Sequence, residues 1–472
     1  MKFIPGILIL LAMGCTTPRA STARAAVTAV CAPARTFGAI PNDGIDDRSA
    51  LQAGTIACAG QTLVLETGTY NVAVVAVSHG AVGVTLASNL LGVDGTVIRF
   101  AGNAGGFDWG GLDINAVSVS ITNVRLEGDA ITGANEHTPL VRVYGPNDGV
   151  QISYSSFYYP EDPTAGKRGD CVSFIGYAAL GTNPDKMIRN MRTHHNVFAS
   201  CARVGVQFHS GTEGEIDHNE FLDGGRAADL DGEGSGGSKL KIHHNHIAVG
   251  PHTTSVLGLQ IQADDGHVIY DNVIDGKAIN LYGCAHCELR DNKVRMDMLS
   301  TAPVLAVTKL SPAYWDHDNQ YTRSASAGPG FVVQVGQRIS APSAVVFEND
   351  MITQHASSVP LQTLGIAGVV LRRSTLTFDG ATATVGWDAE GITDRTTGLV
   401  MDHTSFVGPF SSVMAVTGSY GGTGSVTITD SKAPGAVKGL VCNNVTVGSG
   451  VLGPIVFTGN AMPNPQCGAL WP

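Results

Sequence analysis

The sequence contains few charged residues and even fewer basic ones. Only 15% of its 472 residues are Asp, Glu, Lys or Arg, while 43% are hydrophobic, and this balance excludes a disordered chain. The 40 acidic residues outnumber the 29 basic ones, which argues against a nucleic-acid partner because phosphate binding needs clustered Lys and Arg. An acidic polysaccharide is not excluded, since a metal cation can mediate between an acidic protein and a polyanion.

The N-terminal apolar run is too short to serve as a membrane anchor. It extends from Phe3 to Met13, follows Lys2, and predicts an export signal over residues 1–14. The stretch from Ala12 to Cys15 resembles a bacterial lipobox, although Leu is usual where Ala12 stands, and the resemblance implies lipidation of Cys15. The alternative is plain secretion with cleavage after Ala25. We therefore expect an exported protein, either an outer-membrane or periplasmic lipoprotein or a secreted one, with a tether over residues 15–35.

A second CxxC motif is absent, so Cys284 and Cys287 lack the partners that a zinc site would need. Nine cysteines are present, and setting Cys15 aside leaves an even number, which fits disulfides in an oxidising compartment.

What the sequence does contain is a short recurring phrase: an apolar residue, two polar ones, Asn, any residue and an apolar one. The Asn positions are Asn196, Asn219, Asn245, Asn272, Asn292 and Asn349. Ser or Thr replaces Asn in LRRSTL at 371, MDHTSF at 401 and ITDSKA at 428. The first four steps are 23, 26, 27 and 20 residues, or one coil each, and the last is 57, or two coils. Short β-rich runs at this interval predict strands that stack from coil to coil.

The predicted fold is all-β, a single-stranded right-handed parallel β-helix of about a dozen coils over residues 71–472. Inward Asn side chains at a bend would bond to the backbone of neighbouring coils and satisfy groups otherwise left unpaired. These positions resemble the asparagine ladder of pectate lyases.

The segment FGAIPNDGIDDRSALQAGTIACAGQTLVLETGTY, residues 37 to 70, resembles the opening of the pectate-lyase superfamily. The resemblance implies an N-terminal cap over residues 36–70, with one amphipathic helix that covers the first coil's edge. Asp43, Asp46 and Asp47 are then turn residues. Lyases, hydrolases, epimerases and phage tailspikes share this opening, so it indicates a fold and leaves the reaction open.

Residues close in the sequence of a solenoid are also close in space, which predicts sequential disulfides. The expected pairs are Cys31 with Cys58, Cys171 with Cys201, Cys284 with Cys287, and Cys442 with Cys467.

Five predicted strands of one sheet precede the Asn phrases, at residues 172–175, 206–209, 228–231, 259–262 and 279–282. Alternation directs Val172, Phe174, Val206, Phe208, Ala228, Leu230, Leu259, Ile261, Ile279 and Leu281 inward. It leaves one outward column of Ser173, Gln207, Asp229, Gln260 and Asn280, and a second of Ile175, His209, Asp231, Gln262 and Tyr282. Carboxylates, amides, an imidazole and a phenol in one flat patch suit sugar hydroxyls. The alternative is an ordinary solvated face, but neither column contains Lys.

Two long turns, 156–169 and 311–328, are expected to overhang this face. Their aromatic residues Tyr158, Tyr159, Tyr314 and Trp315 would provide platforms for sugar rings, unless they pack within the loops. The strand RGDCVSF, with Cys201 downstream, is similar to the Asp-Asp-Cys strand of polygalacturonase-type hydrolases, and the similarity carries over only to Asp170. The bend histidines His194, His195, His218, His243, His244 and His246 are interpreted as surface residues and not as metal ligands.

Three functions remain open, and the preferred one is cleavage of a uronate polysaccharide by β-elimination. In this hypothesis Asp229, Asp231, Asp264 and Asp265 hold Ca²⁺, which neutralises the sugar carboxylate, and the base is His209, Tyr282, Arg226 or Lys239. The second function is a glycoside hydrolase that uses Asp229 and Asp231 as its acid pair, or a related C5-epimerase. The third is a non-catalytic glycan-binding or adhesin-like scaffold. The partner is an acidic or neutral polysaccharide in each case.

Overall fold

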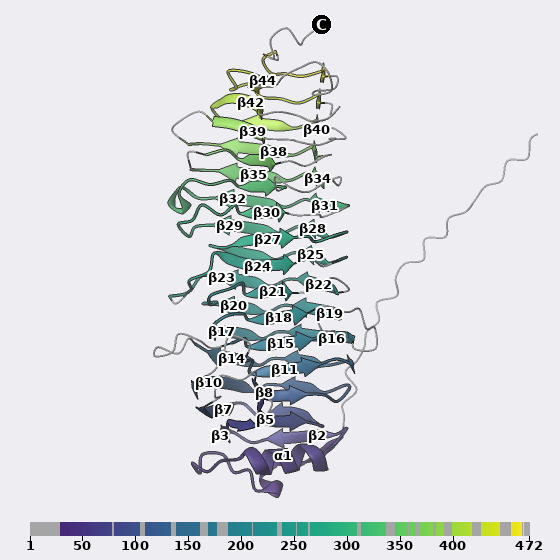
Figure 1. Cartoon of the computed structure of the whole chain (residues 1–472), viewed down its shortest axis with the longest axis vertical. Helices are drawn as coiled ribbons and strands as arrows, with labels where there is room; N and C mark the ends of the chain where they lie inside the picture. The colour runs from purple at the N-terminus through teal and green to yellow at the C-terminus, as the bar shows by residue number, and fades with distance from the viewer. Residues whose placement is uncertain are drawn as a thin grey trace, which may run out of the picture.

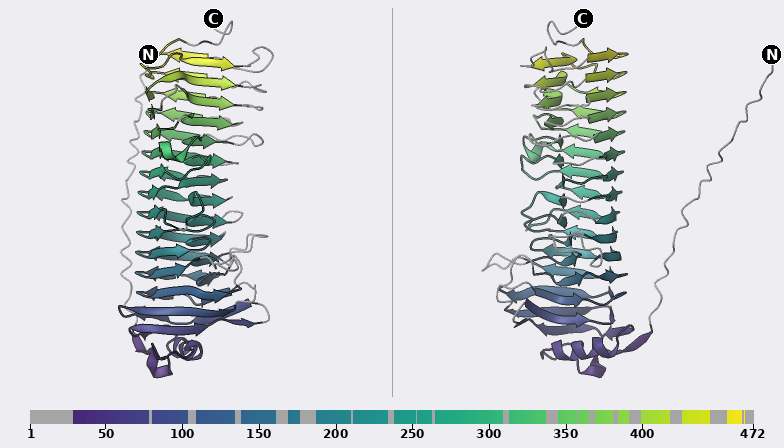
Figure 2. Two further views of the ribbon diagram at one scale, coloured as in Figure 1. Left: turned by 90° about the vertical axis from the view of Figure 1, so that its left-hand side faces the viewer. Right: turned by 45° about the vertical axis from the view of Figure 1, so that its right-hand side comes forward.

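The computed structural model is a tall stack of short strands wound into three sheets (Figures 1 and 2). It describes residues 29–77, 80–103, 109–133, 138–160, 169–176, 187–209, 211–233, 238–251, 253–262, 265–308, 313–336, 345–356, 358–364, 369–380, 384–390, 399–417, 426–443, 455–464 and 466. Each coil contributes one strand to sheet A, then one to sheet B, then one to sheet C. Within these ranges, no helix has both the length and the apolar character needed to cross a bilayer.

The elements have the following bounds. Sheet A contains β1 (Val30–Pro33), β2 (Thr62–Leu65), β6 (Asn89–Gly92), β9 (Ser120–Thr122), β12 (Asn147–Asp148), β13 (Gln151–Ser153), β16 (Ile188–His194), β19 (Thr212–Asp217), β22 (Lys239–His243), β25 (Val268–Tyr270), β28 (Glu288–Arg290), β31 (Tyr314–His317), β34 (Val345–Glu348), β37 (Val369–Arg372), β40 (Leu399–Asp402), β43 (Val426–Thr429) and β45 (Ile455–Thr458). Sheet B contains β3 (Gly68–Ala73), β7 (Thr96–Asn103), β10 (Arg125–Thr132), β14 (Ser156–Tyr159), β17 (Val197–Cys201), β20 (Glu220–Leu222), β23 (His246–Ala248), β26 (Val273–Asp275), β29 (Lys293–Met296), β32 (Gln320–Arg323), β35 (Met351–Gln354), β38 (Thr375–Phe378) and β41 (Ser405–Val407). Sheet C contains β4 (Val75–Val77), β5 (Gly80–Leu86), β8 (Trp109–Ile114), β11 (Val141–Tyr144), β15 (Val172–Ile175), β18 (Val206–His209), β21 (Leu230–Glu233), β24 (Leu257–Gln262), β27 (Ala278–Tyr282), β30 (Leu305–Thr308), β33 (Val333–Val335), β36 (Leu361–Leu364), β39 (Thr384–Glu390), β42 (Phe410–Thr417) and β44 (Leu440–Asn443). The helices are η1 (Ala34–Phe37), α1 (Arg48–Ala57) and η3 (Ala325–Ala327).

Successive strands of each sheet pair in parallel, apart from an antiparallel contact between β4 and β5 at the N-terminal end. Sheet B alone has 13 strands, one per coil, which agrees with the predicted all-β parallel solenoid of about a dozen coils. A continuous core of Val, Ile, Leu and Phe fills the interior along the whole stack.

The asparagine ladder forms at the bend from sheet A to sheet B. The side-chain oxygen of Asn219 accepts both the backbone N–H and the side-chain amide of Asn196, at 3.1 and 3.0 Å. The same pair of bonds links Asn219 to Asn245, Asn245 to Asn272, and Asn272 to Asn292. Each rung thereby satisfies a backbone N–H that the sharp bend leaves without a strand partner.

The residue before each rung adopts the left-handed conformation. His195, His218 and His244 have φ angles of 55°, 54° and 54°, and the equivalent residues of the later coils, from Asp271 to Asp430, lie in the same region. One left-handed residue turns the chain sharply enough to point the following side chain inward. The ladder and the bend are therefore two parts of one repeated structure.

The structure corrects the ladder at two positions. Asn319 is a rung and accepts the backbone N–H of Asn292 at 2.8 Å, so the coil that the sequence pattern skipped does have its marker. The next rung is Asp350 and not Asn349, because Asp350 Oδ1 accepts the Asn319 N–H at 2.8 Å while Asn349 takes the left-handed place. The Ser and Thr replacements are confirmed, since Ser374 and Ser431 accept the corresponding N–H groups.

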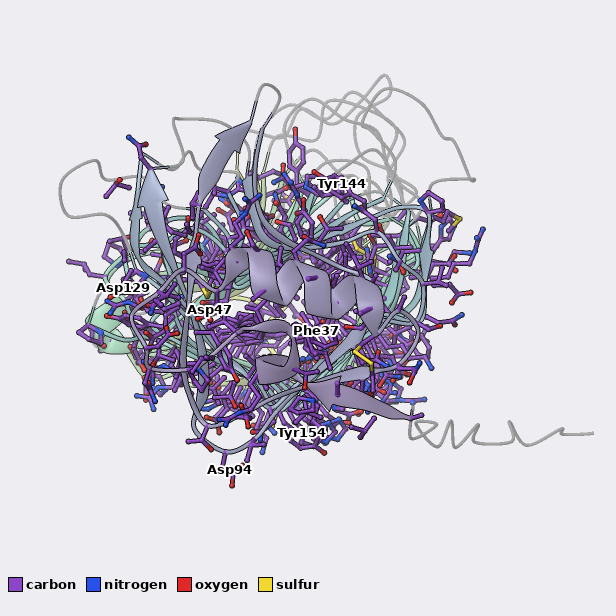
Figure 3. The ribbon with its side chains drawn as sticks, turned by 90° about the horizontal axis from the view of Figure 1, so that it is seen from below. Phe37, Asp47, Asp94, Asp129, Tyr144 and Tyr154 are labelled. Atoms are coloured by element: carbon purple, nitrogen blue, oxygen red, sulfur yellow. A yellow bond between two sulfur atoms is a disulfide. The ribbon has the colours of Figure 1, made fainter. Side chains whose placement is uncertain are left out.

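Helix α1 lies across the N-terminal end of the solenoid, near Phe37 and Asp47 (Figures 1 and 3). The carboxylate of Asp47 accepts the backbone N–H groups of Ile40 and Asn71 at 2.9 and 3.0 Å. Asp46 likewise accepts the N–H groups of Arg48 and Ala73. The predicted helix and the predicted turn role of these acids are confirmed.

Three of the four predicted disulfides are present. They join Cys31 to Cys58, Cys171 to Cys201 and Cys284 to Cys287. Cys467 lies outside the described residues, as does Cys15, so the fourth pairing and the lipidation stay predictions.

A buried acid cluster surrounds the Asp350 rung. Asp316 Oδ2 accepts hydrogen bonds from the hydroxyls of Tyr314 and Tyr321, and its Oδ1 accepts the Asn319 amide at 2.7 Å. Burial raises the pKa of Asp316 to about 6. Burial, and then the adjacent charge of Asp316, raise the pKa of Asp350 well above its ordinary value.

We predict that Asn245→Ala destabilises the protein by about 2–4 kcal/mol. The substitution leaves the Asn219 N–H and the Ile216 carbonyl, both partners of the Asn245 side chain, buried without a hydrogen bond. Urea unfolding followed by circular dichroism measures the loss. Asn349→Gly is the matched control, because a left-handed residue outside the ladder tolerates Gly. Equal losses in the two variants would contradict the assignment of the rungs.

We predict that Asp350→Asn stabilises the protein, and that it does so more strongly at pH 8 than at pH 5. Both pH values lie above the pKa of an unfolded Asp, which is about 3.9. An acid whose folded pKa is raised loses stability as the pH rises from its unfolded pKa through its folded pKa. Asn keeps the ladder oxygen and has no proton to lose. Melting temperatures of both proteins across this pH range test the prediction, and a gain that is independent of pH would contradict it.

Candidate functional site

The outer face of sheet C carries a continuous column of polar side chains. Register pairs Ser173 with Gln207, Gln207 with Asp231, Asp231 with Gln260, and Gln260 with Asn280. The inward residues predicted for these strands are all buried in the core. Neighbouring coils are about 4.8 Å apart, so the column is a flat row of closely spaced hydrogen-bonding groups.

The column is longer than the sequence pattern indicated. From the predicted strands, register extends it through Arg142 and Asp113 on one side and, after an interruption at Ala306, through Gln334, Gln362 and Asp388 on the other. These residues occupy the same outward positions of β8, β11, β33, β36 and β39. Extending the alternation by two coils before Ser173 and by four coils after Asn280 would have found them.

Hydrogen bonds join many neighbours along the column. Arg142 binds Asp113 through two bonds of 2.9 Å. Gln260 Nε2 donates to Asp231 Oδ1 at 3.3 Å, and the Ser173 hydroxyl lies 3.2 Å from Gln207 Oε1. Gln207 and Asp231 are each only 2% exposed although they lie on the outer face. The middle of the column is therefore shielded from bulk water.

The predicted place of Asp229 is wrong. β18 pairs Gln207 with Asp231 and His209 with Glu233, so Asp231 takes the position expected for Asp229. The cause is Gly232, which faces inward against the Phe208 ring, where a Cβ would lie 2.5 Å from Phe208 Cε2. A shift by two residues preserves the alternation, and only the missing side chain of Gly232 distinguishes the two registers.

Asp229 is instead a buried structural residue. Its Oδ2 lies 2.6 Å from Lys277 Nζ, and both side chains are almost completely buried at the corner before sheet C. Burial raises the pKa of Asp229 to about 6, against the opposing effect of Lys277. Asp229 and Asp231 therefore do not form the acid pair that was predicted.

Asp170 is also buried, beside the edge of the column. Arg203 Nε donates to its Oδ1 at 2.8 Å, and the Ser173 hydroxyl lies 3.0 Å from its Oδ2. This ion pair lies next to the disulfide from Cys171 to Cys201. Asp170 is therefore placed to orient Ser173, which contacts Gln207, and not to reach a substrate itself.

The second predicted column is formed by Ile175, His209, Gln262 and Tyr282, with position 233 in place of Asp231. Register pairs Gln262 with Tyr282 and His209 with Glu233. His209, Gln262 and Tyr282 are partly exposed, in contrast to the shielded Gln207 and Asp231. Arg226 and Lys239 are exposed and lie outside sheet C, in the turn before β21 and in β22 respectively.

The aromatic residues of the two predicted overhanging turns lie elsewhere. Tyr158 and Tyr159 belong to β14 of sheet B, with Tyr159 in the core. Tyr314 is a core residue of β31, and Trp315 projects from sheet A, where its ring lies 4.2 Å from that of His317. Most of segment 311–328 belongs to a regular turn of the solenoid, with strands β31 and β32, because its WDHDNQY stretch is another copy of the ladder phrase. Residues 161–168 lie outside the described part of the chain.

The residues predicted to hold Ca²⁺ do not come together where they can be described. The Asp229 carboxylate binds an ammonium group, and Asp265 Oδ1 lies 2.8 Å from His286 Nδ1. Asp264 is outside the described residues. Of the predicted residues that the structure describes, only Asp231 lies on the outer face of sheet C, while Asp229 and Asp265 are held by other partners.

The bend histidines form a surface stack along the left-handed positions. The ring of His218 is parallel to those of His195 and His244, at centroid distances of 4.9 and 4.8 Å. Burial, and then the charge of His218, lower the pKa of His195, so its ring is neutral at pH 7. The positions of His195, His218 and His244 agree with the interpretation of surface residues, but His243 is buried.

Beside the histidine stack, the metal-ligating atoms of Glu215, Asp217 and His243 lie within 4.8 Å of one another, and a second such group, Asp402, His403 and Asp430, lies on later coils of the bend. Asp217 is already held by two bonds to Arg192, at 2.9 and 2.8 Å, and by His218. Burial opposes these bonds but they outweigh it and lower the pKa of Asp217 to about 2. A guanidinium therefore already fills the role that a cation would have there.

Neither a protein-family model nor a curated protein matches the sequence. Solved structures do match its shape. A mutant tailspike protein of E. coli bacteriophage HK620, in complex with a pentasaccharide, is 10% identical, with a TM-score of 0.53 over 91% of this chain and 79% of that chain. The mannuronan C-5 epimerase AlgE4 A-module of Azotobacter vinelandii is 14% identical, with a TM-score of 0.34 over 92% of this chain and 100% of that chain.

The chain is a right-handed parallel β-helix. At these identities the likeness shows the fold alone, in agreement with the pectate-lyase-like resemblance of the sequence.

We predict that Lys277→Met destabilises this β-helix by about 3–5 kcal/mol, because it leaves the Asp229 carboxylate buried without its cation. The double variant Asp229→Leu with Lys277→Met recovers most of that stability, since an apolar pair of similar volume replaces the ions. Urea unfolding of the single and double variants measures both changes in the free energy of unfolding. A double variant as unstable as Lys277→Met would contradict a purely structural role for the pair.

Proposed function

We propose that this chain is an exported carbohydrate-active enzyme that cleaves a polysaccharide along the outer face of sheet C, by β-elimination on a uronate polymer. The observation that carries the proposal is the polar column itself, in which Gln207, Asp231, Gln260 and Asn280 follow one another in register, with His209 beside them. A flat row of amides, a carboxylate and an imidazole matches the hydroxyl and carboxylate groups of an extended glycan. A tailspike protein of the same fold has been solved with a bound pentasaccharide, which supports the ligand class.

The reaction needs two functions from the protein. The part-exposed amide groups of Gln260 and Asn280 donate hydrogen bonds to the uronate carboxylate, which makes the proton on the adjacent C5 more acidic. His209 then accepts that proton, the C5 electron pair forms the C4–C5 double bond, and the C4–O bond breaks with its electrons on the leaving oxygen. A proton from solvent or a nearby acid completes the leaving hydroxyl. The products are one chain with a new reducing end and one chain with an unsaturated uronate at its non-reducing end.

Hydrolysis of the glycosidic bond is the second candidate function, and the strand register of sheet C supports it. Asp231 and Glu233 lie two residues apart on β21, about 6.6 Å along the strand, and Glu233 pairs with His209. A glycosidase needs an acid on the face that its substrate contacts, and Asp231 is an acid at an outward position of sheet C. Hydrolysis would release reducing sugar without an unsaturated end. A C5-epimerase would return the proton and release neither product.

We predict that the purified protein produces the ultraviolet absorbance of unsaturated uronate from alginate or polygalacturonate, and that His209→Gln lowers the rate by about 100-fold or more. His246→Gln is the matched control, because this exposed imidazole lies on sheet B and pairs with Asp275. A parallel assay with EDTA measures any need for a divalent cation.

Three other outcomes would decide against elimination. Reducing sugar without the absorbance change would show hydrolysis, and exchange of the C5 proton without cleavage would show epimerisation. Binding of the polymers without any product would show a non-catalytic glycan-binding β-helix.

A further inference from the structure

A cavity of about 290 Å³ lies on the side of the solenoid opposite the polar column, between the bend and sheet B. Its wall includes the ring of Tyr154, the guanidinium-bearing Arg125, and the polar side chains of Asn123 and Ser156. Figure 3 shows Tyr154 on the other side of the cross-section from Tyr144, which ends β11 of sheet C. Nothing in the proposed reaction uses this cavity.

The cavity exists because the ring stack of the bend ends at Tyr154. Tyr154 occupies the left-handed position of its coil, with a φ of 50°, and its ring stacks on His195 at 5.0 Å. The preceding coil carries Asn123 at the equivalent position, and its amide turns away to Gly92 O and Asp94 Oδ1, at 3.0 and 3.1 Å. Among the described residues, no aromatic ring continues the stack beyond Tyr154.

The floor of the cavity is one row across sheet B. Register places Val97, Arg125, Ser156 and Val197 side by side on adjacent strands. Arg125 is held by its Nε, which lies 2.6 Å from Glu127 Oε1, and its guanidinium lies 5.9 Å from the ring of Tyr158. The guanidinium of Arg125 is thus held by Glu127 next to the ring of Tyr158, and Ser156 lies beside Arg125 on the adjacent strand.

Tyr154 is both rigid and accessible. Its side chain is 59% exposed, yet one ring face rests on His195 and an edge contact of 5.8 Å joins it to His194. An aromatic ring that is already fixed loses little conformational freedom when a ligand stacks on it. Its surroundings are polar, which distinguishes this ring from an exposed patch of apolar core.

We infer that this cavity is a second glycan-binding site, in which one pyranose ring stacks its C–H face on Tyr154 and its hydroxyls hydrogen-bond to Arg125 and Ser156. The volume suits a single sugar unit, since pockets for drug-sized ligands begin at about 300 Å³. The site would hold one segment of a polymer while the outer face of sheet C engages another. It stands on its own geometry and does not depend on the reaction proposed above.

Affinity electrophoresis through gels that contain alginate, polygalacturonate or dextran tests the inference. We expect at least one polymer to retard the wild-type protein, and Tyr154→Ala to weaken that binding by about tenfold, as the loss of one aromatic stack implies. Tyr154→Phe keeps the ring and should bind as the wild type does. Ser156→Trp fills the cavity without removing the ring, and it should weaken binding to the same extent as Tyr154→Ala.

The same gels run in an Asp231→Asn background separate this site from the one on sheet C. A Tyr154-dependent retardation that persists in that background supports two independent sites. Absence of retardation of the wild type by all three polymers overturns the inference, as does retardation that neither Tyr154→Ala nor Ser156→Trp changes. Retardation that depends on Asp231 alone would overturn this second site and leave the proposed function standing.

Discussion

The structure depends on the hydrogen-bonded bend between sheets A and B. A left-handed residue turns the chain, and the next side chain accepts the N–H of the coil before it, as Asn219 does for Asn196. This bond fixes the height and the rotation of each coil relative to its neighbour. Register in all three sheets follows, because every coil is a short loop closed by the same bend. The outer columns on which any function must rely are consequences of this one repeated contact.

Much of the fold could be predicted from the sequence because these bends have a recognisable sequence pattern. Asn, Ser or Thr at fixed places in an apolar phrase shows where the chain turns, and cysteines close in sequence lie on adjacent coils. The prediction of the ladder failed at two rungs, where the rest of the phrase did not support the position of the rung residue. Asn319 was missed because Asp316 stands where the phrase has an apolar residue, and Asp350 was overlooked beside a neighbouring Asn.

The candidate site was harder to predict, since a column requires the register of every strand and not only its alternation. Gly232 has no side chain to reveal that it faces inward, so Asp229 was placed in the strand, two residues away from its actual register at the corner before sheet C. Burial then separates residues that look alike in the sequence. Asp229, Asp170 and Asp231 are all acids near sheet C, but the first two neutralise Lys277 and Arg203 at its corner. Those cations give no sequence signal because their partners are one or two coils away.

A solenoid also explains how the two proposed glycan-binding surfaces could coexist without interfering. Each coil packs mainly against its neighbours, so a change in the outward residues of one sheet leaves the opposite bend unaltered. The Tyr154 ring stack and the column of Gln207 and Asp231 use different sides of adjacent coils. A polymer is long enough to reach both sides of a narrow rod, whereas a short oligosaccharide is not. Binding at two sites raises the local concentration of chain near each of them, so weak individual contacts are enough to keep the protein on its polymer.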